Sequence, residues 1–381
     1  MSMPRRWWIV AGIAVAILAV VALRGHRASP PTVALAPASE GKKAASEDEG
    51  DADFSTRDAN QRRVIRGQWA ALIRWLNGNP RPTPEEIAAR LNELRTEWIA
   101  MDPTVLAAVI AELLESGGDL PTGLKFEVGP HGFLKGWPTL RVFLLDVLAG
   151  SDMEAAVPVA RQVLDSTASA NEFAMAMRSL TRDGPARAGS DELVSRLGSM
   201  LGHVGWGNEP GFAAAFDLAR VIGTPAAART VAAWQGSRTL RAMALDEFAA
   251  DHPAAVTELV TSPEAAALAP AERASLMARI DPADPGQLSA ADRYLRDPAL
   301  TAGEAEMFLK VFPLRSATTG YRLYGDNPAP YTKEGIVAGD RAALDQVNLW
   351  LADPTLAERY QAGLVPLQQR LNGWVKQAAS R

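Results

Sequence analysis

Apolar residues recur three and four positions apart along most of the chain beyond residue 60. One such face comprises Leu106, Val109, Ile110, Leu113 and Leu114. This spacing is that of an α-helix with one buried side. A residue able to cap a helix, followed by proline, precedes several of these runs, as at Thr83-Pro84. Proline loses no hydrogen bond at the first helical position, so each such pair marks a helix start. The body, residues 61–381, is therefore predicted to be all-α.

The predicted helices are joined by short turns that are rich in glycine and proline. They span 60–77, 84–100, 103–116, 139–149, 152–166, 169–182, 190–203, 210–222, 225–235, 238–250, 253–260, 263–268, 271–279, 287–296, 302–311, 340–351 and 355–378. Pro158 and Pro366 are expected to kink or restart their helices, because proline lacks the amide hydrogen. Trp69, Trp75 and Trp98 lie near helical spacing and are expected in the core. Helices with such short connections favour antiparallel pairs stacked one on the next.

The stretch 139–280 resembles the HEAT-like class of helical repeat proteins in the length and spacing of its helices. The segments TVAAW at 230–234 and RAMALDEFAADHPAAVTELV at 241–260 have the composition of such helix pairs, although no consensus recurs. The resemblance implies an α-solenoid of stacked antiparallel helix pairs. A non-repetitive, irregular helical array is the alternative fold.

One short stretch of the body has the pattern of strands. Residues 124–128 and 133–135 flank a turn at Gly129-Pro130-His131-Gly132, which predicts one small β-hairpin. The hairpin lies within the non-helical stretch 117–138, where we place a sub-boundary of the body.

An uncharged apolar run, Trp7–Leu23, follows the short basic N-terminus at residues 1–6. A helix of this length is at the short end for a bilayer core, and its two tryptophans suit the interface. The bulky, basic residues after Leu23 do not suit a signal-peptide cleavage site, so a retained transmembrane anchor is predicted. The basic N-terminus favours a single-pass protein of the inner (cytoplasmic) membrane, with its N-terminus inside and its bulk in the periplasm.

Residues 24–60 lack periodic hydrophobicity. They are first rich in proline and alanine and then mostly acidic. Such a composition cannot bury enough apolar surface to offset its ordering entropy. We therefore expect a disordered linker between the anchor and the body.

Composition excludes several kinds of chemistry. The chain has no cysteine and four histidines, and its formal net charge is −5. Disulfides, thiolate nucleophiles and zinc fingers are excluded, and the charge argues against binding nucleic acid. Glycines 118 and 123 have P-loop spacing, but Leu124 stands where the lysine is required. We expect no cofactor, no metal and no catalytic residues, so the sequence favours a binding protein over an enzyme.

A second non-helical stretch, 312–338, concentrates residues that are common at recognition surfaces. Long loops in compact domains often carry function, and tyrosine and arginine are enriched at protein interfaces. The predicted partner-binding residues are Tyr321, Arg322, Tyr324, Asp326 and Tyr331.

Three functions follow from these patterns. The first is a membrane-tethered, extracytoplasmic scaffold whose helical surface binds a protein partner. The second is a periplasmic steric chaperone for a secreted client, because the anchor, the Ala/Pro spacer and the helical body are similar to those of the lipase-specific foldases. In the stretch 132–149, Arg141 matches the arginine of that family's Arg-Phe-Asp-Tyr type motif, whereas the Phe-Asp-Tyr core is absent. The third is a cell-envelope hydrolase with paired carboxylates such as Glu127 or Asp326.

Overall fold

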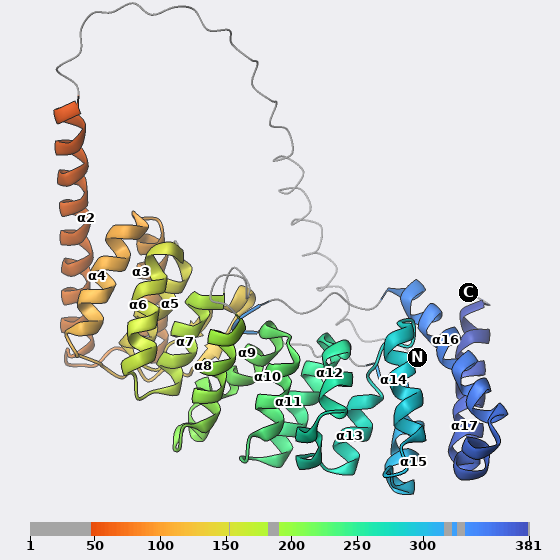
Figure 1. Ribbon diagram of the computed structural model, residues 1–381. Coiled ribbons are helices and arrows are strands. Elements are labelled where there is room, and N and C mark those ends of the chain that lie inside the picture. The colour runs from red at the N-terminus through yellow and green to blue at the C-terminus, as the bar shows by residue number, and fades with distance from the viewer. Residues whose placement is uncertain (1–46, 152, 182–189, 316–321, 326–331, 380–381) are drawn as a thin grey trace, which may run out of the picture. The chain divides into compact units, whose positions relative to one another are not determined.

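The computed structural model describes residues 47–151, 153–181, 190–315, 322–325 and 332–379 (Figure 1). The chain divides into two compact units, Met1–Asp53 and Phe54–Arg381, and the second unit contains almost all of the described residues. These residues are mostly helical, with one small antiparallel sheet of two strands. This confirms the prediction of a helical body with one β-hairpin.

The helices follow one another closely along the chain. The α-helices are α2 (Glu47–Leu76), α3 (Pro84–Ile99), α4 (Pro103–Glu115), α5 (Leu140–Gly150), α6 (Met153–Ser166), α7 (Ala170–Thr181), α8 (Ser190–Gly202), α9 (Ala214–Ile222), α10 (Pro225–Ala233), α11 (Arg238–Asp251), α12 (Pro253–Val260), α13 (Pro270–Met277), α14 (Pro285–Arg296), α15 (Ala302–Val311), α16 (Lys333–Ala352) and α17 (Pro354–Ala379). Short 3₁₀ helices are η1 (Pro130–Gly132), η2 (Trp206–Asn208), η3 (Pro210–Ala213) and η4 (Pro263–Ala267). The strands are β1 (Glu127–Val128) and β2 (Leu134–Gly136).

The helix starts form for the reasons that the sequence indicates. At α3, the hydroxyl of Thr83 accepts a hydrogen bond from the amide of Glu86, and the Glu86 carboxylate accepts one from the amide of Thr83. At α4, the Asp102 carboxylate accepts hydrogen bonds from the amides of Thr104 and Val105. These side chains satisfy amides that have no partner within the helix.

Four predicted boundaries differ from the structure. Helix α2 begins at Glu47, within the predicted linker 24–60. Helix α16 begins at Lys333, which shortens the predicted loop 312–338. The predicted helix 263–268 is the 3₁₀ helix η4, and the predicted helix 210–222 is divided between η3 and α9.

Two expectations about single residues hold only in part. Helices α6 and α17 each continue through their interior prolines, Pro158 and Pro366, so the prolines do not restart these helices, and a kink there stays a prediction. Buried apolar residues lie on both sides of Pro366, so packing outweighs the one lost hydrogen bond. Trp69 and Trp98 are in the core as predicted, but Trp75 is 38 % exposed.

The helices of the second unit contact one another in two interleaved series. Odd-numbered helices from α3 to α17 each contact the next odd-numbered helix, and α8, α10, α12 and α14 form a corresponding even-numbered series. Most consecutive helices also contact each other, so the chain alternates between two layers (Figure 1). The core lies between these layers.

Ion pairs between helices recur at a constant offset along the chain. Four arginines each pair with an acid 31 positions further on: Arg141–Glu172, Arg161–Glu192, Arg220–Asp251 and Arg273–Glu304. Arg241 and Glu272 have the same offset, with 3.7 Å between the charged groups. Each pair joins one helix to the next but one. The structure thus shows a regular offset between paired arginines and acids, although the sequence has no recurring consensus around these residues.

The β-hairpin is fixed to the helices by the buried carboxylate of Asp146 on α5. This carboxylate accepts hydrogen bonds from the guanidinium groups of Arg178, at 2.8 Å, and Arg95, at 3.2 Å. It also accepts one from the indole of Trp137, at 2.9 Å, and lies 3.4 Å from the amide of Leu134 on β2. Two cations and two neutral donors therefore surround one anion that has no access to water.

Among the described residues, no helix is long and apolar enough to cross a membrane. The predicted anchor Trp7–Leu23 lies outside the described residues, and so does most of the predicted linker.

Candidate functional site

A hollow of about 700 Å³ opens between α12, η4, α13, α14 and α15, and we call it the pocket. Its wall is formed largely by small and apolar residues, including Val260, Ala265 and Leu300. Its charged residues include Arg273, Arg293 and Arg296. A concave, mostly apolar site with a few polar groups is the usual form of a ligand-binding site.

The floor of the pocket is a closed network of three side chains. The guanidinium of Arg273 donates to both carboxylate oxygens of Glu304, at 2.9 and 2.6 Å. The hydroxyl of Tyr294 donates to the same carboxylate at 2.7 Å. Burial, followed by this hydrogen bond, raises the pKa of Tyr294 well above its ordinary value. The floor is therefore electrically balanced, and its polar groups are engaged with one another.

The mouth of the pocket carries two further arginines in different situations. Arg296 donates to the carboxylates of Asp292, at 2.9 Å, and Asp353, at 2.7 Å. Arg293 is exposed and makes no hydrogen bond or ion pair within the part of the chain that the structure describes. Among the described residues, Arg293 is thus a pocket cation without an ion pair, and the pocket's lining also includes the carboxylate of Asp297.

Removing the charge of Glu304 should weaken this floor. We expect Glu304→Gln to lower the free energy of unfolding by roughly 1–3 kcal/mol, because Arg273 and Tyr294 lose an ionised acceptor in a buried place. Urea denaturation followed by circular dichroism measures the change. Glu306→Gln, at an exposed position of the same helix, is the matched control and should change stability by less than about 0.5 kcal/mol.

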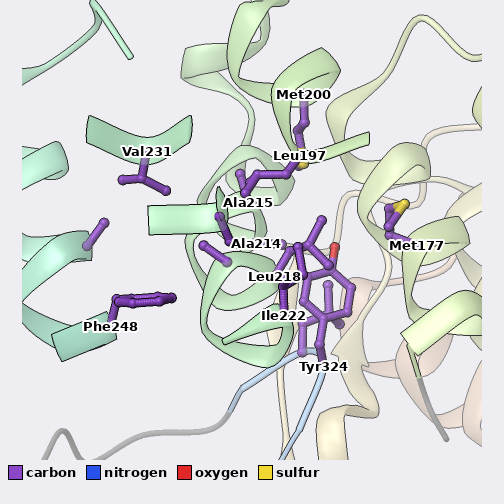
Figure 2. Close-up of a cluster of buried hydrophobic side chains, with 14 of the residues drawn as sticks. Met177, Leu197, Met200, Ala214, Ala215, Leu218, Ile222, Val231, Phe248 and Tyr324 are labelled. Atoms are coloured by element: carbon purple, nitrogen blue, oxygen red, sulfur yellow. The ribbon is translucent and has the colours of Figure 1, made fainter. Parts of the chain in front are cut away.

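The described ones among the predicted partner-binding residues, Arg322 and Tyr324, lie elsewhere, in a segment that we call the strap, residues 322–325. Arg322 donates to the carboxylate of Asp251 on α11 at 2.8 Å. Tyr324 is buried, and its hydroxyl donates to the carbonyl of Ala174 on α7 at 3.0 Å. Figure 2 shows the Tyr324 ring beside Leu218 and Ile222 of α9.

Of the five predicted partner-binding residues, the structure brings two together. Tyr321, Asp326 and Tyr331 lie outside the described residues. The contacts of Arg322 and Tyr324 hold the strap against three helices, and their role in binding a partner stays a prediction. The sequence favoured this stretch because it is rich in tyrosine. The structure gives one of these tyrosines, Tyr324, a packing role within the chain.

The strap contacts a cluster of charged side chains around the buried Arg220. Arg220 lies 2.6 Å from Asp251, 3.3 Å from Glu247 and 3.8 Å from Asp217. The carboxylate of Asp217 also accepts a hydrogen bond from the amide of Leu323 at 3.1 Å. Burial raises the pKa of Asp217 and of Glu247 above the ordinary carboxyl range. Three acids thus share two cations, Arg220 and Arg322.

The raised pKa of Asp217 should make stability depend on pH. As the pH rises from about 4, this carboxyl ionises first in the unfolded chain, so the free energy of unfolding falls until it ionises in the folded chain as well. Asp217→Asn should flatten that fall, while its amide oxygen can still accept from Leu323. Urea denaturation at several pH values between about 4 and 7 measures the slope. Exposed Asp191, changed to Asn, is the control, and an equal flattening there would contradict the assignment.

The residues of the other predicted functions are placed as follows. Glu127 is exposed on β1, 3.8 Å from Lys135, and Asp326 lies outside the described residues. Arg141, in the stretch similar to the foldases, donates to Glu172 and to the carbonyl of Leu114. Within the described ranges, no group of three or more histidine, aspartate or glutamate side chains is arranged to hold a metal ion.

Sequence reasoning missed the pocket entirely. Its arginines lie on helices whose charged residues look like ordinary solvated faces. The one available signal is the offset of 31 positions between Arg273 and Glu304, which recurs in other pairs.

Comparison with protein-family models, with curated proteins and with solved structures finds no match for this chain.

Proposed function

We propose that this protein is a membrane-tethered, extracytoplasmic scaffold that binds a protein partner at the pocket. In finer terms, we propose a HEAT-like α-solenoid, in which antiparallel helix pairs stack through neighbour contacts. The two interleaved contact series and the constant 31-position offset support this architecture. The run Trp7–Leu23 would be the anchor, with the bulk of the chain in the periplasm.

The pocket is the observation that carries the proposal. It combines an apolar wall with the unpaired cation Arg293, which is the composition of a binding site. Its other ionisable groups have partners. Arg273 and Tyr294 both contact Glu304, Arg296 contacts two carboxylates, and Asp297 accepts a hydrogen bond from the amide of Ala299. An acid or base committed in this way must first give up its partner before it can transfer a proton, so the geometry favours binding over hydrolysis.

Photo-crosslinking in cells tests the proposal directly. A photoreactive amino acid replaces Ala299, which is exposed at the pocket, in the full-length chain. We expect one reproducible crosslinked protein in the membrane fraction, and we expect Arg293→Glu to remove it.

The matched control carries the photoreactive residue at exposed Glu85 on α3. The same protein crosslinked equally at both positions, or unaffected by Arg293→Glu, contradicts a binding site at the pocket. Alkaline carbonate extraction tests the tether separately, because release of the intact chain from membranes contradicts the anchor.

A further inference from the structure

The strap contacts the helices in the way that a docked peptide contacts a receptor. Three consecutive residues each meet a different helix: Arg322 meets Asp251 on α11, Leu323 meets Asp217 on α9, and Tyr324 meets Ala174 on α7. These partners lie 71, 106 and 150 positions away along the chain. Leu323 and Tyr324 are only 1 % and 5 % exposed. The strap is thus held by side chains and main chain of remote helices.

The surface beneath the strap, which we call the cradle, comprises Gly132, Ala174, Asp217 and Asp251. The turn of the hairpin lies close to the main chain of the strap. A Cβ added to Gly132 would clash with the carbonyl oxygen of Leu323 and would lie 3.1 Å from that of Arg322. Gly132 also has a φ of +71°, which few other residues adopt. At Gly132, the cradle therefore lets the backbone of a bound peptide approach closely, because no side chain is in the way.

The charge of the cradle matches a cationic ligand. Without Arg322, the acids Asp217, Glu247 and Asp251 face a single cation, Arg220. Arg322 restores part of the balance through its hydrogen bond to Asp251. One carboxylate oxygen of Asp251 and one terminal nitrogen of Arg322 are nevertheless buried without a hydrogen-bond partner among the described residues. Of the cradle's own atoms, the strap's described residues thus leave this oxygen of Asp251 without a donor.

We propose that the cradle is a second binding site, for a partner-protein segment in which arginine, an aliphatic residue and tyrosine follow one another. In this chain the strap fills the site in cis. The arginine pairs with Asp251, the main-chain amide after it donates to Asp217, and the phenol donates to the Ala174 carbonyl. A partner segment of this chemistry displaces the strap and makes the same three contacts. The inference does not depend on the pocket, because the two sites share no residue.

A synthetic peptide tests this in trans. The probe is fluorescein-Gly-Arg-Leu-Tyr-Gly-amide, and its binding to the full chain is followed by fluorescence anisotropy. A tethered strap competes at high effective concentration, so wild type should bind the probe weakly. The double variant Arg322→Ala/Tyr324→Ala empties the two side-chain positions of the strap, and we expect it to bind roughly tenfold more tightly.

Two controls separate recognition from general stickiness. Adding Asp251→Asn to the double variant should weaken binding by roughly tenfold, because the charge-assisted hydrogen bond is lost. A peptide with glutamate and phenylalanine in place of arginine and tyrosine should not bind. Arg293→Glu, at the pocket, should leave probe binding unchanged, so that failure of the pocket proposal and failure of this one are distinguished.

Several results overturn the proposal. One is a double variant that is folded by circular dichroism and binds the probe no better than wild type. Another is binding that is insensitive to Asp251→Asn. A double variant that forms dimers with the cradle inaccessible to the probe also counts against a partner segment. If the double variant does not fold, Arg322→Ala alone is tested, and absence of tighter probe binding to that folded chain overturns the proposal.

Discussion

Replacing Asp146 with alanine is expected to lower the free energy of unfolding by about 3–5 kcal/mol. The side chain of Arg178 is 4 % exposed and pairs with this carboxylate at 2.8 Å. Removing the anion takes away the charge that lies 2.8 Å from this buried guanidinium. It also removes the acceptor for the Trp137 indole and for Arg95. A large loss follows because one carboxylate serves several buried donors.

Urea denaturation of the full chain, followed by tryptophan fluorescence and circular dichroism, measures this effect. Glu93→Ala is the matched control, since Glu93 forms an exposed pair with Arg90 on α3. Exposed pairs contribute about 0–1 kcal/mol, so the control should remain close to wild type. Similar losses in both variants would contradict the importance of burial at Asp146.

Replacing Trp350 with alanine should also cost about 3–5 kcal/mol, through the cavity that it leaves. Trp350 on α16 is fully buried, with its ring 6.4 Å from that of Phe308 and 6.1 Å from that of Phe312. Its indole donates to Asp292 on α14 at 2.9 Å. One side chain therefore joins α14, α15 and α16.

The loss should be concentrated near the C-terminal helices, because most contacts join neighbouring helices. Hydrogen exchange read by mass spectrometry should show faster exchange in α14–α17 and little change in α3 and α4. Leu349→Ala is the control, since the adjacent Leu349 is 64 % exposed. Uniformly faster exchange along the whole body would contradict local propagation.

Local chemistry explains why so much of the fold could be predicted. The start of α3 follows from Thr83, Pro84 and Glu86, which lie within four positions of one another. The hairpin follows from its glycines and proline, although β1 is shorter than predicted. Prediction failed where the burial of a side chain depends on a residue far away in the sequence. Trp75 has helical spacing, but whether it is buried depends on which helices pack against α2.

The candidate sites depend even more on contacts between residues that are far apart in the sequence. Tyr324 was selected from composition, yet its position depends on a hydrogen bond to Ala174, 150 positions away. The pocket depends on how five elements converge around Glu304, and no local pattern encodes that convergence. The only sequence signal for the pairing of Arg273 with Glu304 is the number of positions between them. A single sequence contains too few pairs with this offset for the pairing to be predicted from it.

The strap also has a mechanical consequence. Helices that meet only their neighbours form an elastic series, in which small changes of tilt add up from one end to the other. The strap is covalently continuous with α15 and α16, yet it is fastened to α7, α9 and α11. The chain between α15 and α16 therefore returns to three earlier helices, and one short segment connects distant parts of the sequence. Releasing the strap would remove the contacts through which it joins α7, α9 and α11.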